Sequence, residues 1–286
     1  NSQTEPSIHL STNDQILLQY INQYVKPDDE SMNADVTKAN QLIKALEEKA
    51  KSQKTKDQNA TIRLAGSRAK GYAIKDHSDF DVLVIFPCPV VDCKQTDNQY
   101  FLYDQDGNEI TSAKYSELSL IILHRASEVL KTTGDVVLHQ MQLPMRRYEI
   151  SYTPNNQQSK IEFDILLVVE HPFRQGDYFI PYSSKSECWY PSFTETQLTH
   201  AKTLEKEYPG SSELIQFLKH IKYKRGWKVA SMGLELLVYW YCKKQCKLSE
   251  DWTKHGLVKH LKEICLFGQQ EYKDGRGPLY YDRPGQ

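Results

Sequence analysis

Residues 64–86 read LAGSRAKGYAIKDHSDFDVLVIF, and this stretch decides the fold. It contains a Gly-Ser turn, Gly66-Ser67, followed by the acidic pair Asp79 and Asp81 at the start of an apolar run. Alternate side chains of a β-strand point to the same face, so the two aspartates are expected to lie side by side at the entrance of a strand. Two carboxylates held that close repel each other unless a cation lies between them.

A third acidic residue extends the pattern. Hard oxygen ligands on a rigid strand suit Mg²⁺ or Mn²⁺. In KIEFDILLVVE (residues 160–170), Asp164 interrupts an otherwise apolar strand. The DFD segment alone would indicate a solvated strand end, but a lone carboxylate among buried apolar residues is costly. We therefore predict that Asp79, Asp81 and Asp164 bind two Mg²⁺ ions, for which Mn²⁺ can substitute.

The Gly-Ser turn supplies the second half of the predicted site. Glycine allows a close approach of the backbone, and the hydroxyl of Ser67 and the first N–H groups of a following helix can receive phosphate oxygens. A Gly-Ser pair alone usually marks only a turn. Together with three carboxylates, Gly66 and Ser67 predict a cleft in which phosphates held by the turn meet metals held by the aspartates.

The order of the elements indicates an α+β fold with two lobes. Period-two and helical patterns predict a mixed sheet after two N-terminal helices, and then a helical second half. We expect a core lobe at residues 1–190, with the N-terminal helices and the catalytic sheet, and a C-terminal helical lobe at residues 191–286. Strands are expected at residues 61–65, 81–86, 135–141, 148–152 and 160–169, and helices at residues 16–25, 35–46, 67–72, 115–131, 193–207, 212–223, 231–244 and 253–267.

The composition excludes several classes of protein. With 39% hydrophobic and 26% charged residues in 286, the chain can form a sizeable core, and a formal charge of −1 is unlike that of a protein that coats nucleic acid. The six cysteines are scattered and are expected to be free thiols. No apolar run reaches membrane-spanning length and no signal-peptide core is recognisable, so we expect a cytoplasmic protein without membrane contacts.

Several segments resemble one family. The GS…DFD stretch, including Lys70 before the second glycine, resembles the corresponding segment of the 2′-5′ oligoadenylate synthetases, which belong to the polymerase-beta-like nucleotidyltransferase superfamily. CWYPSFTETQL (residues 188–198) resembles their C-x-x-F-T-E-L-Q segment. SSELIQFLKHIKY (residues 211–223) and GLELLVYWY (residues 233–241) resemble their L-I-x-L-V-K-H-W and A-L-E-L-L-x-V-Y runs, and GPLYYDRPGQ (residues 277–286) resembles R-P-V-I-L-D-P-A-D-P. The cyclic GMP-AMP synthase group, with its animal cGAS-like receptors, shares the fold and the three carboxylates.

The resemblance implies a bilobal nucleotidyltransferase fold and an activity. It predicts that ATP is joined into 2′-5′-linked oligoadenylate with release of pyrophosphate, as an innate immune and antiviral second messenger. In this family three carboxylates hold two metal ions, and Asp164 would also help to deprotonate the attacking hydroxyl. Lys219, which matches the lysine of the K-H-W run, would neutralise the triphosphate. The implied nucleotide-binding residues are Gly66, Ser67, Lys70, Gln197, Lys219 and Ser231.

The chain also departs from the synthetase pattern. Ser231-Met232 replaces the Gln-Tyr that precedes A-L-E-L-L, and Gln216 replaces an arginine. Met232 offers a softer contact to the donor base than tyrosine does. A serine at position 231 resembles the cyclic-dinucleotide branch, so the alternative product is a cyclic dinucleotide made from ATP and GTP. A catalytically silent RNA-binding sensor is the third alternative.

The family also implies an activator. Double-stranded RNA would bind behind the active site through its backbone, and A-form RNA would be recognised by shape. The opposing interpretation is a solvated basic loop, because the family's arginine after FTELQ is Leu198 here. The candidate RNA contacts are Lys49, Lys51, Lys54, Lys56 and Lys202.

Overall fold

The structure is a computed structural model. It describes residues 10–27, 37, 40–45, 48, 61–75, 79–86, 90–96, 99–139, 147–155, 160–183, 187–192, 194–246, 252 and 255–273. The chain divides into two compact units. The sheet unit comprises Asp29–Lys70 and Asp79–Leu198, and the helical unit comprises Asn1–Asp28, Gly71–Ser78 and Thr199–Gln286.

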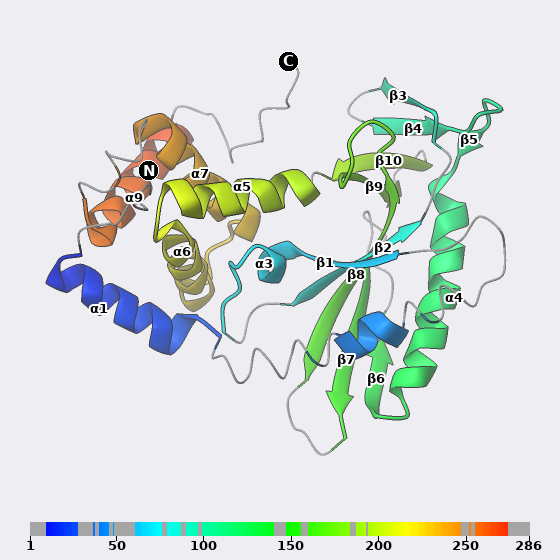
Figure 1. Cartoon of the computed structure of the whole chain (residues 1–286), viewed down its shortest axis with the longest axis horizontal. Coiled ribbons are helices and arrows are strands. Elements are labelled where there is room, and N and C mark those ends of the chain that lie inside the picture. Colours follow the sequence, from blue (N-terminus) through cyan, green and yellow to red (C-terminus); the bar gives the residue numbers. More distant parts are fainter. Residues whose placement is uncertain are drawn as a thin grey trace, which may run out of the picture. The chain divides into compact units, whose positions relative to one another are not determined.

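The strands of the sheet unit form one mixed sheet (Figure 1). Its central pair is parallel, and the other neighbouring strands run antiparallel. β7 (Tyr148–Pro154) pairs with β8 on the side away from β2, β6 (Gly134–Leu138) pairs with β7, and β5 (Glu109–Ile110) pairs with β4. The main strand order is β1 (Thr61–Ala65), β2 (Phe80–Phe86), β8 (Ile161–Glu170), β9 (Tyr178–Ser183), β10 (Glu187–Ser192), β4 (Gln99–Tyr103) and β3 (Asp92–Thr96).

One face of the sheet is covered by α4 (Ser112–Leu130), which lies along it in Figure 1. Leu123, Ala126 and Leu130 of this helix are buried against alternate residues of β2 and β8, such as Val82 and Ile165. Burial of each such side chain stabilises the fold by roughly 1.5–3 kcal/mol. This apolar face fixes the register of the two central strands, because a one-residue slip would turn their apolar side chains away from α4.

The opposite face of the same strands carries a smaller apolar cluster, which includes Leu83, Val168 and Tyr178. Successive side chains of β2 and β8 point to opposite faces of the sheet, so Asp81 and Asp164 lie on this face, next to the apolar cluster. The predicted catalytic strands therefore have one face devoted to the core and one that carries the acids.

The helical unit has its own core. Leu17, Ile21 and Val25 from α1 (Thr12–Tyr20) and the π-helical turn η1 (Ile21–Val25) pack with buried residues of the C-terminal helices, such as Leu214 and Val238. Trp252 is fully buried in this core. The C-terminal helices are α5 (Thr194–Glu207, whose first residues belong to the sheet unit), α6 (Ser211–Arg225), α7 (Ser231–Gln245) and α9 (Leu257–Lys273).

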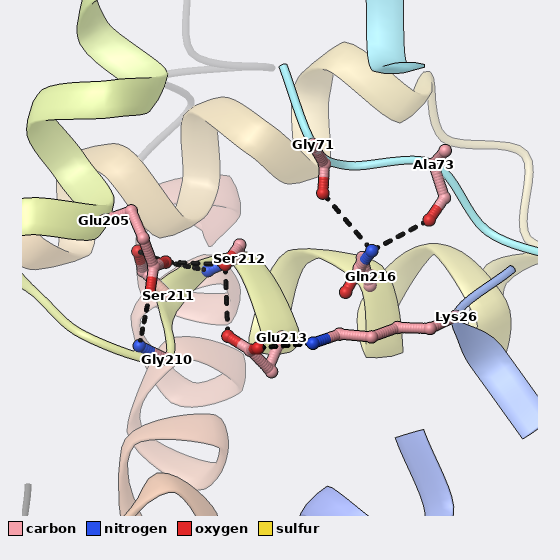
Figure 2. A network of polar contacts seen from close by, with 9 residues as sticks. All are labelled: Lys26, Gly71, Ala73, Glu205, Gly210, Ser211, Ser212, Glu213 and Gln216. Atoms are coloured by element: carbon pink, nitrogen blue, oxygen red, sulfur yellow. Dashed lines mark hydrogen bonds and ion pairs between the residues drawn. The ribbon is translucent and has the colours of Figure 1, made fainter. Parts of the chain in front are cut away.

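Helix α6 fastens the segment that follows the Gly-Ser turn along the chain (Figure 2). Gln216, which is only 5% exposed, donates hydrogen bonds from Nε2 to the carbonyl oxygens of Gly71 at 3.2 Å and Ala73 at 2.9 Å. At the start of the helix, the Glu205 carboxylate accepts from the backbone N–H groups of Gly210 and Ser212 at 2.9 Å each. The Gln216 hydrogen bonds thus hold residues 71–73 on α6, and the Glu205 carboxylate caps the start of the helix.

Most of the predicted elements are present, and the α+β fold class is confirmed. The predicted strand at 61–65 coincides with β1, and the predicted helix at 115–131 nearly coincides with α4. The strands between Asp92 and Ile110 and between Tyr178 and Ser192 were not predicted, because they lie at the end of the sheet where the apolar alternation is weak. The domain division between residues 190 and 191 stays a prediction; by their contacts, the residues of α1 belong with the C-terminal helices.

The described cysteines Cys93, Cys188, Cys242, Cys246 and Cys265 are free thiols. Within the described residues, no helix is both long enough and apolar enough to cross a membrane.

Replacing Gln216 with leucine tests the fastening of residues 71–73. Leu fills a similar volume but cannot donate to the two carbonyl oxygens, so we expect a loss of about 1–3 kcal/mol in the free energy of unfolding. Amide hydrogen exchange in peptides that cover residues 71–75 should become faster. The control is Gln245→Leu at the exposed end of α7. Equal exchange in the Gln216→Leu variant and in the wild type would contradict the assigned role.

Candidate active site

The three predicted carboxylates come together in the sheet unit. Asp81 is the register partner of Asp164 across the parallel pair β2 and β8. Neighbouring strands lie about 4.8 Å apart, so the two side chains leave the same face of the sheet at close range. Asp79 lies just before β2, two residues from Asp81, and close enough to Asp164 for its charge to raise the pKa of that residue.

The sequence analysis missed further charged residues on this face. Glu149 of β7 is the register partner of Asp164 on its other side, and Glu162 lies two residues before Asp164 on β8. We call Asp79, Asp81, Glu149, Glu162 and Asp164 the acidic cluster. Two arginines balance part of its charge, since Arg147 and Arg68 both lower the pKa of Asp79.

Arg147 makes a direct contact to this cluster. Its Nη1 donates to Oδ2 of Asp164 at 2.7 Å, and the two side chains are 33% and 13% exposed. Arg147 directly precedes β7 and shares a face with Glu149, two residues away. The alternation in RRYE (residues 146–149) indicated that Arg147 and Glu149 share a face of one strand, but the sequence did not indicate that this strand pairs with β8 in register with Asp164.

The pKa values show that the carboxylates interact electrostatically. The pKa of Asp164 is raised from 3.8 to about 6; burial is the main cause, the Arg147 charge opposes it, and the charges of Asp81, Asp79 and Glu149 add to it. The pKa of Asp79 is also raised, first by desolvation and then by the charges of Glu162 and Glu149. Mutual repulsion of this kind is relieved by a bound cation.

Gly66 has a steric role in the site. Its φ of +69° is in the left-handed region, and an added Cβ would overlap the carboxylate of Asp81 and lie 2.8 Å from the Asp81 Cβ. The pairing of Ala65 with Asp81 across β1 and β2 explains this proximity. Ser67 and Lys70 follow at and just after the short helix α3 (Gly66–Ala69), and both are partly buried. Close packing therefore explains the glycine of the Gly-Ser turn, whether or not a ligand binds there.

Lys219 has an unexpected environment in the helical unit. Its side chain is almost fully buried, its Nζ lies 2.7 Å from Oε1 of Glu235, and it donates to the carbonyl oxygen of Tyr72 at 3.4 Å. The lysine of the K-H-W-like run and the glutamate of the L-E-L-L-like run thus form a buried ion pair between α6 and α7. The predicted triphosphate contact of Lys219 stays a prediction, and in this structure its ammonium group pairs with Glu235.

Ser231, at the start of α7, accepts a hydrogen bond at 3.0 Å from Nζ of Lys222, a lysine that the sequence analysis did not select. Gln197 is partly buried on α5, and Lys202 is exposed on the same helix. Their predicted contacts to nucleotide and RNA stay predictions. The other candidate RNA contacts, Lys49, Lys51, Lys54 and Lys56, lie outside the described residues, as do the Asp35–Val36 start of the second predicted helix and the segment GPLYYDRPGQ.

The FTETQ segment anchors α5 within the sheet unit. Glu195 forms an ion pair with Arg63 of β1, and the hydroxyl of Thr196 donates to Oδ2 of Asp177 at 3.2 Å. Gly176 is required beside this anchor, because an added Cβ would lie 2.8 Å from that of Glu195. Glu195 and Thr196, two residues of the segment that resembles the synthetases, therefore have structural partners in the sheet unit.

Comparison with known proteins agrees with this geometry. Residues 40–132 match the family described as "Nucleotidyltransferase domain", which includes the Gly-Ser turn, Asp79 and Asp81 but ends before Asp164. No curated protein matches the sequence of the chain significantly. The structure is similar to that of Escherichia coli MS115-1 CdnC with ATP, at a TM-score of 0.54 and 15% identity over 80% of this chain. The chain has the nucleotidyltransferase fold.

A second structure, the complex of Escherichia coli MS115-1 CdnC with HORMA-deltaN, gives the same TM-score of 0.54 and 15% identity over 82% of this chain. This nucleotidyltransferase-fold chain spans 65% and 66% of the length of the two CdnC chains. At this identity the similarity establishes the fold alone. The predicted fold is confirmed, whereas a specific membership of the oligoadenylate synthetases stays a prediction.

The acidic cluster fits divalent cations in its chemistry. Its donors are carboxylate oxygens, which Mg²⁺ and Mn²⁺ prefer. After burial, the charges of neighbouring carboxylates add to the raised pKa values of Asp79 and Asp164, and a bound cation would offset that repulsion. In the part of the chain that the structure describes, however, no three His, Cys, Asp or Glu side chains are arranged to hold a metal ion as they stand. Asp79, Asp81 and Asp164 would hold the ions after adjustment of their side chains.

Gly66→Ala should disturb the site more than a positive φ alone explains. Alanine at a positive φ costs about 1–2 kcal/mol in the free energy of unfolding. At Gly66 the methyl group must also displace Asp81, which should cost on the order of 1–3 kcal/mol more. The matched control is Gly107→Ala, because Gly107 has a φ of +78° and open space around its Cβ position. Equal losses for both variants in urea unfolding would contradict this packing.

Asp164→Asn should stabilise the metal-free protein at neutral pH. An acid whose pKa is raised on folding favours the folded state when protonated, so stability falls as the pH rises from about 4 to about 6 and the cost is complete above that. Asparagine avoids this cost. In EDTA we expect the variant to be more stable by on the order of 2 kcal/mol at pH 7.5, and this advantage should vanish near pH 4. Asp135→Asn, on the exposed surface of β6, is the control.

Proposed function

We propose that the protein is a divalent-metal-dependent nucleotidyltransferase that joins nucleotides from nucleoside triphosphates and releases pyrophosphate. The observation that carries this proposal is the registered pairing of Asp81 and Asp164 on parallel strands, with Gly66 packed against the Asp81 carboxylate. The match of residues 40–132 to the nucleotidyltransferase domain supports it.

The chain's own residues would act as follows. Asp79, Asp81 and Asp164 would hold two metal ions, Mg²⁺ or Mn²⁺, and the backbone N–H of Gly66 and the hydroxyl of Ser67 would donate to the triphosphate. A ribose hydroxyl oxygen forms a bond to the α-phosphorus, the bond from that phosphorus to the bridging oxygen breaks, and pyrophosphate leaves. Asp164 accepts the proton of the attacking hydroxyl. When bound, the ions supply Lewis acidity at the α-phosphate and charge stabilisation of the leaving group.

The proposed substrate is ATP and the first candidate product is 2′-5′-linked oligoadenylate. The ordered motifs shared with the oligoadenylate synthetases support this product, and the similar fold of CdnC was solved with ATP. Glu235 and Lys219, which come from two of those motifs, form a buried ion pair in this chain.

The second candidate product is a cyclic dinucleotide from ATP and GTP. Ser231 favours it, because this position resembles the cyclic-dinucleotide branch and its hydroxyl receives a hydrogen bond from Lys222. A serine hydroxyl beside an ammonium group is suited to phosphate oxygens. Ser231 and Lys219 remain proposed nucleotide contacts of the helical unit, and Lys70 and Gln197 those of the sheet unit.

Double-stranded RNA is the proposed activator in an innate immune role. Lys202 is exposed on α5, and the end of α6 adds an exposed basic and aromatic stretch that includes Lys224, Arg225, Trp227 and Lys228. Exposed basic side chains of this kind can contact the phosphate backbone of a duplex. Binding through these residues should weaken steeply as salt rises.

The experiment measures products by mass. Purified protein is incubated with ATP, or with ATP and GTP, in Mg²⁺ or Mn²⁺, with and without long double-stranded RNA. A ladder from ATP alone that resists a 3′-5′-specific nuclease supports oligoadenylate, and a single phosphatase-resistant dinucleotide supports the cyclic product. The Asp81→Asn/Asp164→Asn double variant should lose about 10³-fold or more in rate, because each catalytic electrostatic interaction contributes several kcal/mol.

Two results would contradict the proposal. Equal product formation by the double variant would show that the acidic cluster does not catalyse the reaction. No product under any condition, with RNA binding that is unchanged in the double variant, would favour the catalytically silent sensor.

A further inference from the structure

The acidic cluster already contains a cation of the protein itself. Arg147 donates to Oδ2 of Asp164 at 2.7 Å, and Asp164 is buried apart from a small part of its side chain. The guanidinium is fixed to the edge of the cluster by its place in the chain, because β7 pairs with β8 from Tyr148 onward and Arg147 comes directly before that residue.

The charge of Arg147 reaches beyond one carboxylate. It opposes the rise in the pKa of Asp164, and it also lowers the pKa of Asp79, which lies at the entrance of β2. Arg68 acts on Asp79 as well, but its guanidinium lies over the ring of Phe80 at 4.0 Å. The positive charge of Arg147 therefore acts on two of the three carboxylates of the predicted metal site, Asp164 and Asp79.

A divalent ion that bound Oδ2 of Asp164 would meet the guanidinium of Arg147 at the same oxygen atom. Mg²⁺ binds carboxylate oxygens at about 2.0–2.1 Å with strict geometry, and a second cation within hydrogen-bond distance of that oxygen would be repelled.

We propose that Arg147 is the resident countercharge of Asp164, which a divalent metal ion must displace, so that Arg147 sets the metal affinity of the acidic cluster. This inference rests on the proposed function, because it concerns the same three carboxylates. Arg147 is thus a positioning residue: it keeps the Asp164 carboxylate ordered and neutralised until a metal ion replaces it.

The test measures binding of Mn²⁺ alone, without nucleotide, from the electron paramagnetic resonance signal of the unbound ion. Arg147→Gln removes the charge and should tighten Mn²⁺ binding roughly three- to tenfold, the effect expected when a partly buried competing ion pair is lost. Arg147→Lys keeps the charge but loses the planar fork of the guanidinium, so its affinity should lie between those of Arg147→Gln and the wild type. Thermal melts in EDTA confirm that each variant is folded.

The matched control is Arg125→Gln. Arg125 is exposed on α4, which covers the other face of the sheet, so this variant changes the net charge equally without touching the cluster. Its Mn²⁺ affinity should equal that of the wild type. An equal gain in Mn²⁺ affinity in the Arg125→Gln and Arg147→Gln variants would show that the effect comes from net charge alone, and it would overturn the proposal.

The outcomes separate this inference from the proposed function. Asp81→Asn/Asp164→Asn should abolish specific Mn²⁺ binding; if it does not, the acidic cluster is not the metal site and both proposals fail. If binding depends on the aspartates but Arg147→Gln leaves it unchanged or weaker, only the role of Arg147 is overturned. If neither the wild type nor Arg147→Gln binds Mn²⁺, the competition proposed here is likewise refuted.

Discussion

Parallel pairing of β2 with β8 brings the carboxylates of Asp81 and Asp164 onto one face of the sheet in register, where like charges repel. The pairing is held from the other face, where Val82 and Ile165 are buried in the core that α4 covers. Slipping the register to relieve the repulsion would expose these apolar residues to water. Burial on one face thus maintains an unfavourable arrangement of charge on the other, which is the usual way in which a fold supports a reactive site.

The surrounding residues are adapted to that arrangement. Gly66 makes room for the Asp81 carboxylate, and Arg147 neutralises Asp164. Glu149 completes a row of acids across three neighbouring strands. The charge of this cluster and its oxygen donors are the reason for which we propose a metal-dependent reaction, and the nucleotidyltransferase fold is the reason for which we propose nucleotides as its substrates.

Several residues of the motifs that resemble the synthetases also make ion pairs that support the fold. The lysine and glutamate of two helical motifs, Lys219 and Glu235, form a buried ion pair in which loss of either partner would leave an uncompensated charge. Glu195 of the FTETQ segment pairs with Arg63 of the sheet. These motif residues therefore contribute to the fold of this chain through ion pairs.

The sequence by itself determined the fold class, the strands at 61–65 and 81–86, and the carboxylates Asp79, Asp81 and Asp164, because period-two alternation and a charge within an apolar run are local signals. Only the tertiary structure decided that Asp81 faces Asp164, that Glu149 and Arg147 join them, and that Lys219 is buried beside Glu235. These relations join residues that lie up to about eighty positions apart. They are set by strand register and helix packing, and no local pattern in one sequence encodes which distant residue a side chain will meet.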